Sequence, residues 1–232
     1  MRKPKIIISK NGPYLVSGRL PLGKEISQIG NEGEPEQWVK GTQYPHQDNY
    51  TLCRCGRSAN KPFCDGTHAS AGFDGTETAS RKPYAKQAER TEGPGLDLDD
   101  AESLCATGRF CHPGGGVWDL TMASNEPRKR AAAIRQACNC PSGRLVAYHK
   151  KTGKPMDTAC APSISLIEDP QAKASGPIWV KGGVAIESGG GAAYEARNRV
   201  TLCRCGKSRN KPFCDGSHIR AKFNDGDESL NK

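Results

Sequence analysis

One sixteen-residue phrase occurs twice in this chain and constrains its fold more than any other feature. It runs from Cys53 to His68 and again from Cys203 to His218. Each copy gathers three thiols and one imidazole in a segment too short to bury a core of its own. Ligands packed this closely are typical of a metal site. The candidate ligands are Cys53, Cys55, Cys64 and His68 in the first copy, and Cys203, Cys205, Cys214 and His218 in the second.

The composition favours a fold that bound metal helps to stabilise. Of the 232 residues, 35% are hydrophobic and 6% aromatic, and the chain contains 27 glycines and 16 prolines. Such a chain buries a thin core, so we expect metal to contribute free energy of folding. The length and the repeat together indicate two or three small domains.

The eleven cysteines are expected to be free thiols rather than disulfides. The first residues contain only the short apolar run Ile6–Ile8, which is not a signal peptide. No segment approaches the ~20 apolar residues that cross a bilayer. We therefore expect a cytoplasmic chain with no membrane contact, because a reducing compartment keeps thiols available for metal.

The repeat extends beyond the cysteines. Gly12–Gly18 matches Gly176–Gly182, and the segment that follows is longer in the first copy. In the phrase itself, Pro62 directs the chain before Cys64, and Asp65 is expected to cap a short helix that carries His68. Short β-branched runs bounded by Gly and Pro predict strands. These runs are Lys5–Ser9, Tyr14–Ser17, Ser163–Ile167, Ile178–Lys181 and Val184–Ser188.

The pattern Cys-x-Cys-x2-Ser-x3-Pro-x-Cys-Asp-Gly-Ser/Thr-His, present in both copies, resembles the CDGSH iron–sulfur domain family. The resemblance implies a [2Fe–2S] cluster held by three cysteines and one histidine at each site. It also implies a cap of short strands made by two intertwined protomers, here an internal pseudo-twofold pair with strands exchanged between the halves. The ligand set by itself also permits a Cys3His zinc site.

A different unit lies between the repeats. Its stretch Leu104–Cys111, together with Cys140–Gly143, resembles the divergent single-cluster ferredoxin type. The resemblance implies a [4Fe–4S] cluster, or a [3Fe–4S] cluster if only Cys105, Cys111 and Cys140 bind. Zinc is the alternative metal.

We take Cys138 as the fourth ligand, because Cys-x-Cys spacing already brings two thiols together in the repeats. His112 is the alternative ligand. Cys160 has no partner motif and is expected to be a thiol without a metal. A helix is expected over 128–137, with Pro127 in its first turn and Ser124 or Asn125 as its cap, and a strand over 144–148.

The expected fold is a small, loop-rich α+β protein in which a ferredoxin-like α+β unit joins two CDGSH units. The expected domains are a first CDGSH unit with N-terminal strands (1–80), a linker (81–95), the ferredoxin-like unit (96–160) and a second CDGSH unit (161–232). We expect a monomer with an internal pseudo-dimer, or a weak homodimer.

The formal charge of +9 does not indicate nucleic-acid binding. Lysines and arginines are scattered and few aromatics interleave with them. Two [2Fe–2S] clusters and one [4Fe–4S] cluster, with their thiolates, would lower the net charge to about +5. A basic surface of this kind suits an acidic redox partner.

These observations predict an electron-transfer protein that binds two [2Fe–2S] clusters and one [4Fe–4S] or [3Fe–4S] cluster. No constellation of catalytic residues stands out, so we do not expect an enzyme. The alternatives are a protein that transfers clusters to an apo-protein or senses redox state, and a zinc-stabilised interaction module.

Overall fold

The computed structural model describes residues 3–231. This part of the chain is α+β, rich in loops and dominated by strands, as expected. The expected domains 1–80 and 161–232 include residues 1–2 and 232, which lie outside the described residues. The strands are β1 (Lys5–Ile8), β2 (Tyr14–Ser17), β3 (Leu22–Ile29), β4 (Pro35–Gln43), β5 (Asn49–Leu52), β6 (Glu89–Glu92), β7 (Leu96–Asp100), β8 (Leu145–His149), β9 (Ser163–Asp169), β10 (Ala174–Lys181), β11 (Ala185–Ser188) and β12 (Arg199–Leu202).

The helices are short, apart from one. They are α1 (Thr67–Ser70), α2 (Val117–Met122), α3 (Pro127–Asn139) and α4 (Ser217–Arg220). Single turns of 3₁₀ helix add Tyr84–Lys86, Glu102–Leu104, Pro113–Gly115 and Glu228–Asn231. All five strands expected from the β-branched runs are present, within a few residues at their ends.

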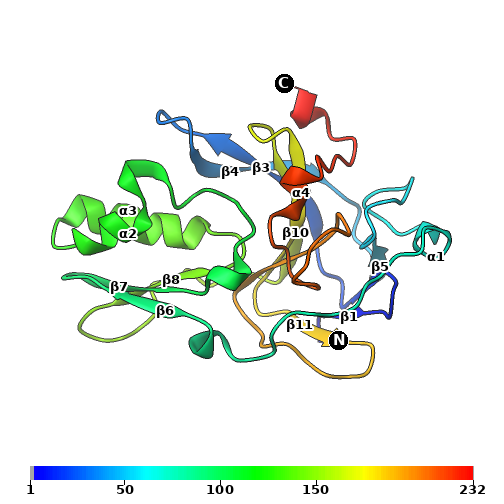
Figure 1. The fold of residues 1–232 in the computed structure, drawn as a ribbon, viewed down its shortest axis with the longest axis horizontal. Coiled ribbons are helices and arrows are strands. Elements are labelled where there is room, and N and C mark those ends of the chain that lie inside the picture. Colours follow the sequence, from blue (N-terminus) through cyan, green and yellow to red (C-terminus); the bar gives the residue numbers. More distant parts are fainter. Residues whose placement is uncertain (1–2, 232) are drawn as a thin grey trace.

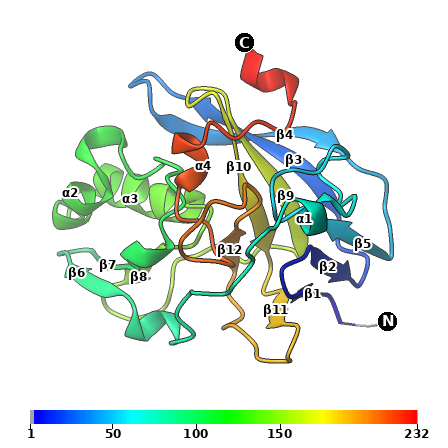
Figure 2. The same cartoon turned by 45° about the vertical axis from the view of Figure 1, so that its right-hand side comes forward.

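The two repeats exchange strands (Figures 1 and 2). In the first copy β1 pairs with β2 and β2 with β5, all antiparallel; in the second copy β9 pairs with β10 and β10 with β12 in the same way. The exchange comes at the outer strand of each set. β11 of the second copy lies parallel to β1, and β3 of the first copy lies parallel to β9. This arrangement confirms an internal pair with crossed strands.

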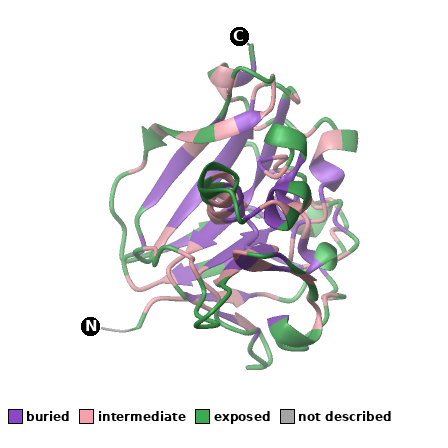
Figure 3. Ribbon diagram, turned by 90° about the vertical axis from the view of Figure 1, so that its left-hand side faces the viewer, coloured by how far each residue is buried: buried purple, intermediate pink, exposed green. Residues whose placement is uncertain are grey.

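A single core joins the two copies (Figure 3). It draws buried side chains from both repeats, including Ile6, Tyr14 and Leu52 from the first, and Ile164 and Leu202 from the second. Strands of each copy complete the sheet of the other. If the two CDGSH units were treated as separate domains, the boundary between them would therefore cut through this shared core. The repeats therefore fold as one body.

Two glycines hold the ligand loops back to back. Gly56 and Gly206 have φ values of +76° and +75°, which favour glycine over any residue with a side chain. A β-carbon at Gly56 would overlap the backbone of Cys205, and one at Gly206 would overlap the backbone of Cys55. Only glycine permits this approach of the two loops across the pseudo-twofold axis.

The longer segment of the first copy forms a hairpin, β3–β4. It extends the sheet to the order β12-β10-β9-β3-β4, with β4 at the edge. The Trp38 ring on β4 stacks on Phe110 of the middle unit with 4.4 Å between ring centres, and lies 5.0 Å from Trp179. Its indole N–H donates to the carbonyl of Asn139 at 3.1 Å. The hairpin therefore fastens the middle unit to the paired repeats.

The middle unit has its own small core. The antiparallel sheet β6-β7-β8 packs under α2 and α3, and Leu96, Leu98, Val117, Ala133 and Leu145 are buried between them. Residues 81–95 were expected to be a linker, but β6 within them pairs with β7 from Glu89 to Glu92. The sequence gives no sign of this strand, because its side chains are polar and largely exposed.

The long helix α3 lies close to its expected position, with Pro127 in its first turn, but its cap differs. Glu126 is the N-cap, and neither Ser124 nor Asn125 has that role. The Ser124 hydroxyl instead accepts the backbone N–H groups of Gly95 and Leu96 at 2.9 and 3.2 Å. Among residues 3–231, none of the helices has the length and apolar character needed to span a bilayer.

The exchange of contacts between repeats can be tested at Tyr14. Its buried hydroxyl donates to the carbonyls of Cys203 at 2.8 Å and Pro212 at 3.2 Å, both in the other copy. Tyr14→Phe leaves these buried carbonyls without that donor, so we expect the free energy of unfolding to fall by about 1–3 kcal/mol. Urea denaturation followed by circular dichroism measures the loss. Tyr44→Phe is the control, because the described structure gives the Tyr44 hydroxyl no hydrogen bond; equal effects would contradict the assignment.

Candidate metal centres

In each CDGSH loop the chain folds back on the end of a strand. In the first copy, the N–H of Cys53 donates to Pro62 and the N–H of Cys64 donates to Thr51, at 2.8 and 3.1 Å. In the second copy the equivalent bonds, Cys203 to Pro212 and Cys214 to Thr201, measure 2.8 and 3.0 Å. These bonds place the third cysteine beside the first.

The aspartate that follows the third cysteine of each copy shapes the loop. Asp65 was expected to be the N-cap of α1, but Gly66 holds that position with φ at +89°. The Asp65 carboxylate accepts the N–H groups of Ala59 at 2.7 Å and Thr67 at 3.0 Å, which closes the loop before the helix. Asp215 accepts the equivalent N–H groups of Arg209 and Ser217 in the second copy.

The four candidate ligands of each loop form two pairs. In the first copy the Sγ atoms of Cys53 and Cys55 are 3.7 Å apart, and Cys64 Sγ lies 3.3 Å from Nδ1 of His68. In the second copy Cys203 and Cys205 are also 3.7 Å apart, and Cys214 lies 3.3 Å from Nδ1 of His218. Two sulfurs on one tetrahedral metal with bonds of about 2.3 Å lie about 3.8 Å apart. Each pair therefore has the spacing of two ligands on one metal atom.

The pairs do not merge into a single-metal site. Across residues 3–231, no three side chains of the His, Cys, Asp and Glu types converge on one ion position. The donor set thus fits two metal atoms per loop with two ligands each. Backbone N–H groups also point at the sulfurs, from Arg57 to Cys55 at 3.4 Å and from Gly216 to Cys214 at 3.4 Å.

Burial keeps several of these thiols protonated unless a cation replaces the proton. It raises the pKa of Cys55 and, more strongly, that of Cys214. Cys203 differs, because a hydrogen bond with Cys205 lowers its pKa and so stabilises one thiolate within the pair. A metal centre supplies the missing positive charge for the others.

An arginine between the first two cysteines of each copy is a structural residue that sequence reasoning missed. Arg54 is buried, donates to the carbonyl of Gly75 and lies over the ring of Phe73. Arg204 is also buried, donates to the carbonyls of Gly176 and Ile167, and pairs with Glu168 and Asp225. An arginine stands at this place in both copies of the phrase, and that repetition could have indicated its structural role.

The two copies differ in how deeply their ligands lie. Cys214 and His218 are only 2% and 3% exposed, whereas Cys64 and His68 are half-buried. Burial, followed by the positive charge of Arg204, lowers the pKa of His218 to about 4. The same phrase therefore occupies two different environments.

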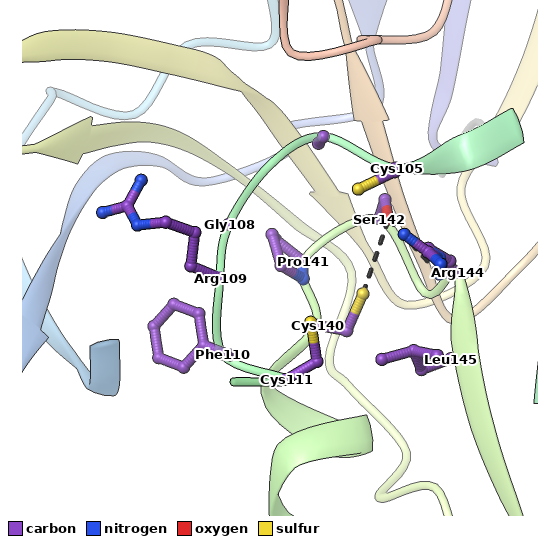
Figure 4. A pocket seen from close by; sticks show the side chains of 11 residues that line it. Cys105, Gly108, Arg109, Phe110, Cys111, Cys140, Pro141, Ser142, Arg144 and Leu145 are labelled. Carbon is purple, nitrogen blue, oxygen red and sulfur yellow. Dashed lines mark hydrogen bonds between the residues drawn. The ribbon is translucent and has the colours of Figure 1, made fainter. Parts of the chain in front are cut away.

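Three cysteines of the middle unit line one small cavity (Figure 4). Cys105 follows a 3₁₀ turn, Cys111 precedes α2, and Cys140 is the extended residue that ends α3. Thr107 and Arg109 have φ values of +58° and +61°, which bend the connecting loop around the cavity. Left-handed backbone at residues other than glycine is strained and clusters at functional sites.

The surroundings of this cavity suit an anionic group. Burial and then the neighbouring Cys140 raise the pKa of Cys111 to about 12. The guanidinium of Arg144 lies beside Cys105 and is anchored by Asp100 at 2.7 Å. The Ser142 hydroxyl lies 3.5 Å from Cys140 Sγ. These groups can hold a cluster through three thiolates with a fixed positive charge next to it.

The structure does not bring Cys138 to this cavity. Cys138 lies in the last turn of α3, where residues two apart point to different faces, and its thiol lies 3.7 Å from the carbonyl of Met156. Cys-x-Cys spacing brings thiols together in the turning loops of the repeats, but not across the end of a helix. His112 points elsewhere too, with Nδ1 3.2 Å from Glu34. Cys160 lies with its thiol near the carbonyl of Thr158.

The role of Arg204 can be tested by removing its charge. Arg204→Ala leaves the buried carboxylates of Glu168 and Asp225 with one cation fewer, so we expect the free energy of unfolding to fall by about 3–5 kcal/mol. Thermal or urea unfolding at pH 7 measures the change. Arg220→Ala, on the exposed side of α4, is the control and should stay within about 0.5 kcal/mol of the parent. A small effect at Arg204 would contradict its structural role.

Comparison with known families agrees with this geometry. Residues 11–69 and 175–219 both match the model described as iron-binding zinc finger, CDGSH type. Residues 91–150 match the model described as divergent 4Fe-4S mono-cluster. Neither the curated proteins nor the solved structures gave a match. The chain is thus an iron–sulfur protein in which two segments that match the CDGSH-type model flank a segment that matches the divergent 4Fe–4S mono-cluster model.

Proposed function

We propose that this chain is an electron-transfer protein that binds one [2Fe–2S] cluster in each CDGSH loop and a third cluster in the middle unit. Bound clusters accept and release single electrons. The observation that carries the proposal is the division of each ligand set into two pairs. A [2Fe–2S] cluster takes two protein ligands on each of its two irons, whereas one tetrahedral zinc needs all four ligands around one point.

The middle unit supports a cluster with three protein ligands. In the ferredoxin run Cys-x2-Cys-x2-Cys, the outer cysteines have the spacing of Cys105 and Cys111, and Gly108 takes the place of the middle ligand. Three thiols satisfy the three irons of a [3Fe–4S] cluster. A [4Fe–4S] cluster would leave one iron without a protein ligand.

The second CDGSH loop adjoins both of the other sites. The middle site adjoins the second CDGSH loop, because a β-carbon at Gly216 would overlap the side chain of Thr107, and Asn210 donates to the carbonyl of Ser103 at 2.8 Å. That loop in turn lies back to back with the first loop at Gly56 and Gly206. A row of adjoining redox sites favours passage of electrons along the chain.

A second candidate function is delivery of a cluster to an apo-protein. The observation that favours it is the half-buried state of Cys64 and His68 in the first loop. The proposal includes no catalysis by side chains.

We also infer that the protein is a monomer with an internal pair, because the strand exchange is completed within one chain. Its redox partner is expected to have an acidic surface, which suits the positive net charge of this chain.

Metal analysis tests the cluster assignment. For anaerobically purified protein we expect iron and acid-labile sulfide in amounts that match two [2Fe–2S] clusters and one larger cluster, without stoichiometric zinc. Cys53→Ala and Cys203→Ala should each remove one [2Fe–2S] signal from the electron paramagnetic resonance spectrum of the reduced protein. A folded protein that holds zinc in its CDGSH loops would sink the redox function.

The ligands of the middle cluster can be separated by paired variants. Cys140→Ala removes a cavity thiol and should abolish the middle cluster, whereas Cys138→Ala should leave its spectrum unchanged. Equal loss in both variants would restore Cys138 as a ligand.

Gly108→Cys tests the nuclearity. Its β-carbon would lie 3.1 Å from Pro141 Cδ, so the loop must shift slightly to admit it. We expect the added thiol to complete a [4Fe–4S] cluster, seen as loss of the three-iron signal in the oxidised protein. If the three-iron signal of the Gly108→Cys variant were the same as that of the parent, position 108 would not be the place of a missing fourth ligand.

A further inference from the structure

We propose that the middle unit seals the second CDGSH site, so that exchange of a cluster with other molecules runs through the first site alone. The inference rests on the proposed function, because it concerns [2Fe–2S] clusters at both loops. It goes beyond that function by giving the two repeats different roles.

The first observation is the difference at a matched pair of glycines. Gly66 and Gly216 begin α1 and α4 with φ values of +89° and +79°. Nothing lies within 4 Å of a β-carbon built at Gly66, which is exposed. A β-carbon at Gly216 would overlap the side chain of Thr107 from the middle unit. The loop that carries Cys105 and Cys111 therefore lies directly over the second site.

The second observation is that this loop is anchored on the far side. Arg109 forms two hydrogen bonds with the Asp169 carboxylate, at 2.8 and 3.0 Å, and lies 3.8 Å from Glu34 of the β3–β4 hairpin. Figure 4 shows Arg109 and Phe110 turned away from the cavity sulfurs. Phe110 stacks on Trp38 of the same hairpin.

The third observation is the arrangement of the molecule. In both ribbon views α4 lies on the side of the middle unit, and α1 lies on the opposite side of the paired repeats (Figures 1 and 2). The long β3–β4 hairpin belongs to the first copy but lies beside β9 of the second copy, so it can hold a cover over the second site. Opening the second site requires the loop to leave its contacts with Asp169 and Trp38.

Release of clusters tests the proposal. Native mass spectrometry of the loaded protein in excess EDTA follows each [2Fe–2S] unit as it leaves, and the Cys140→Ala variant separates these losses from those of the middle cluster. We expect one unit to leave at least about tenfold faster than the other. The fast phase should be missing in Cys64→Ala, and the slow phase in Cys214→Ala.

Variants of the cover give the sharper test. Thr107→Gly should speed the slow phase severalfold and leave the fast phase unchanged. Gly216→Ala and Gly66→Ala impose similar backbone strain, but only the first pushes Thr107 away, so Gly216→Ala should bring the slow rate toward the fast one. Equal release rates from both sites in the parent, or a fast phase that belongs to the second site, would overturn the sealing. A loaded protein without any [2Fe–2S] unit would instead overturn the proposed function, and the sealing with it.

Discussion

Parallel pairing between strands of different repeats is the interaction on which the rest of this structure depends. β11 completes the sheet of the first copy and β3 completes that of the second, so neither copy has a finished sheet alone. The pairing also brings the ligand loops together at Gly56 and Gly206, where only bare backbone fits. Because β3 pairs with β9, the next strand of the hairpin, β4, lies at the edge of that sheet, where it meets the middle unit. Fold, site spacing and domain contact follow from one set of backbone hydrogen bonds.

The ligand loops show a balance between burial and charge. Arg54 and Arg204 occupy the same place in the phrase and both are buried, yet Arg204 is matched by two carboxylates while Arg54 donates to main-chain carbonyls. Around the middle cavity, Arg144 provides a fixed positive charge next to Cys105. Cysteines that bind metal are deprotonated and therefore negatively charged. A buried arginine next to such a thiolate compensates this charge.

Much of this arrangement could be predicted from the sequence. The β-branched runs predict the strands, the repeated phrase predicts the short helices that carry His68 and His218, and the resemblance to the CDGSH family implies the crossed pairing. Other features depend on contacts between distant segments. The β3–β4 hairpin reads only as a longer connection, and β6 reads as a polar linker. Cys138 does not line the cavity with the other three thiols, because the same Cys-x-Cys spacing has a different geometry at the end of a helix than in a turning loop. The covering of Gly216 by Thr107 leaves no trace in either copy of the phrase.

The divergence at Tyr14 shows what fusion of two repeats makes possible. Its counterpart in the second copy is Ile178, which carries no hydroxyl, so the bond from Tyr14 to Cys203 has no mirror image. In a symmetric homodimer every substitution is made in both halves at once. Linking the halves in a single polypeptide removes that obligation, and each half can then acquire neighbours and tolerances of its own.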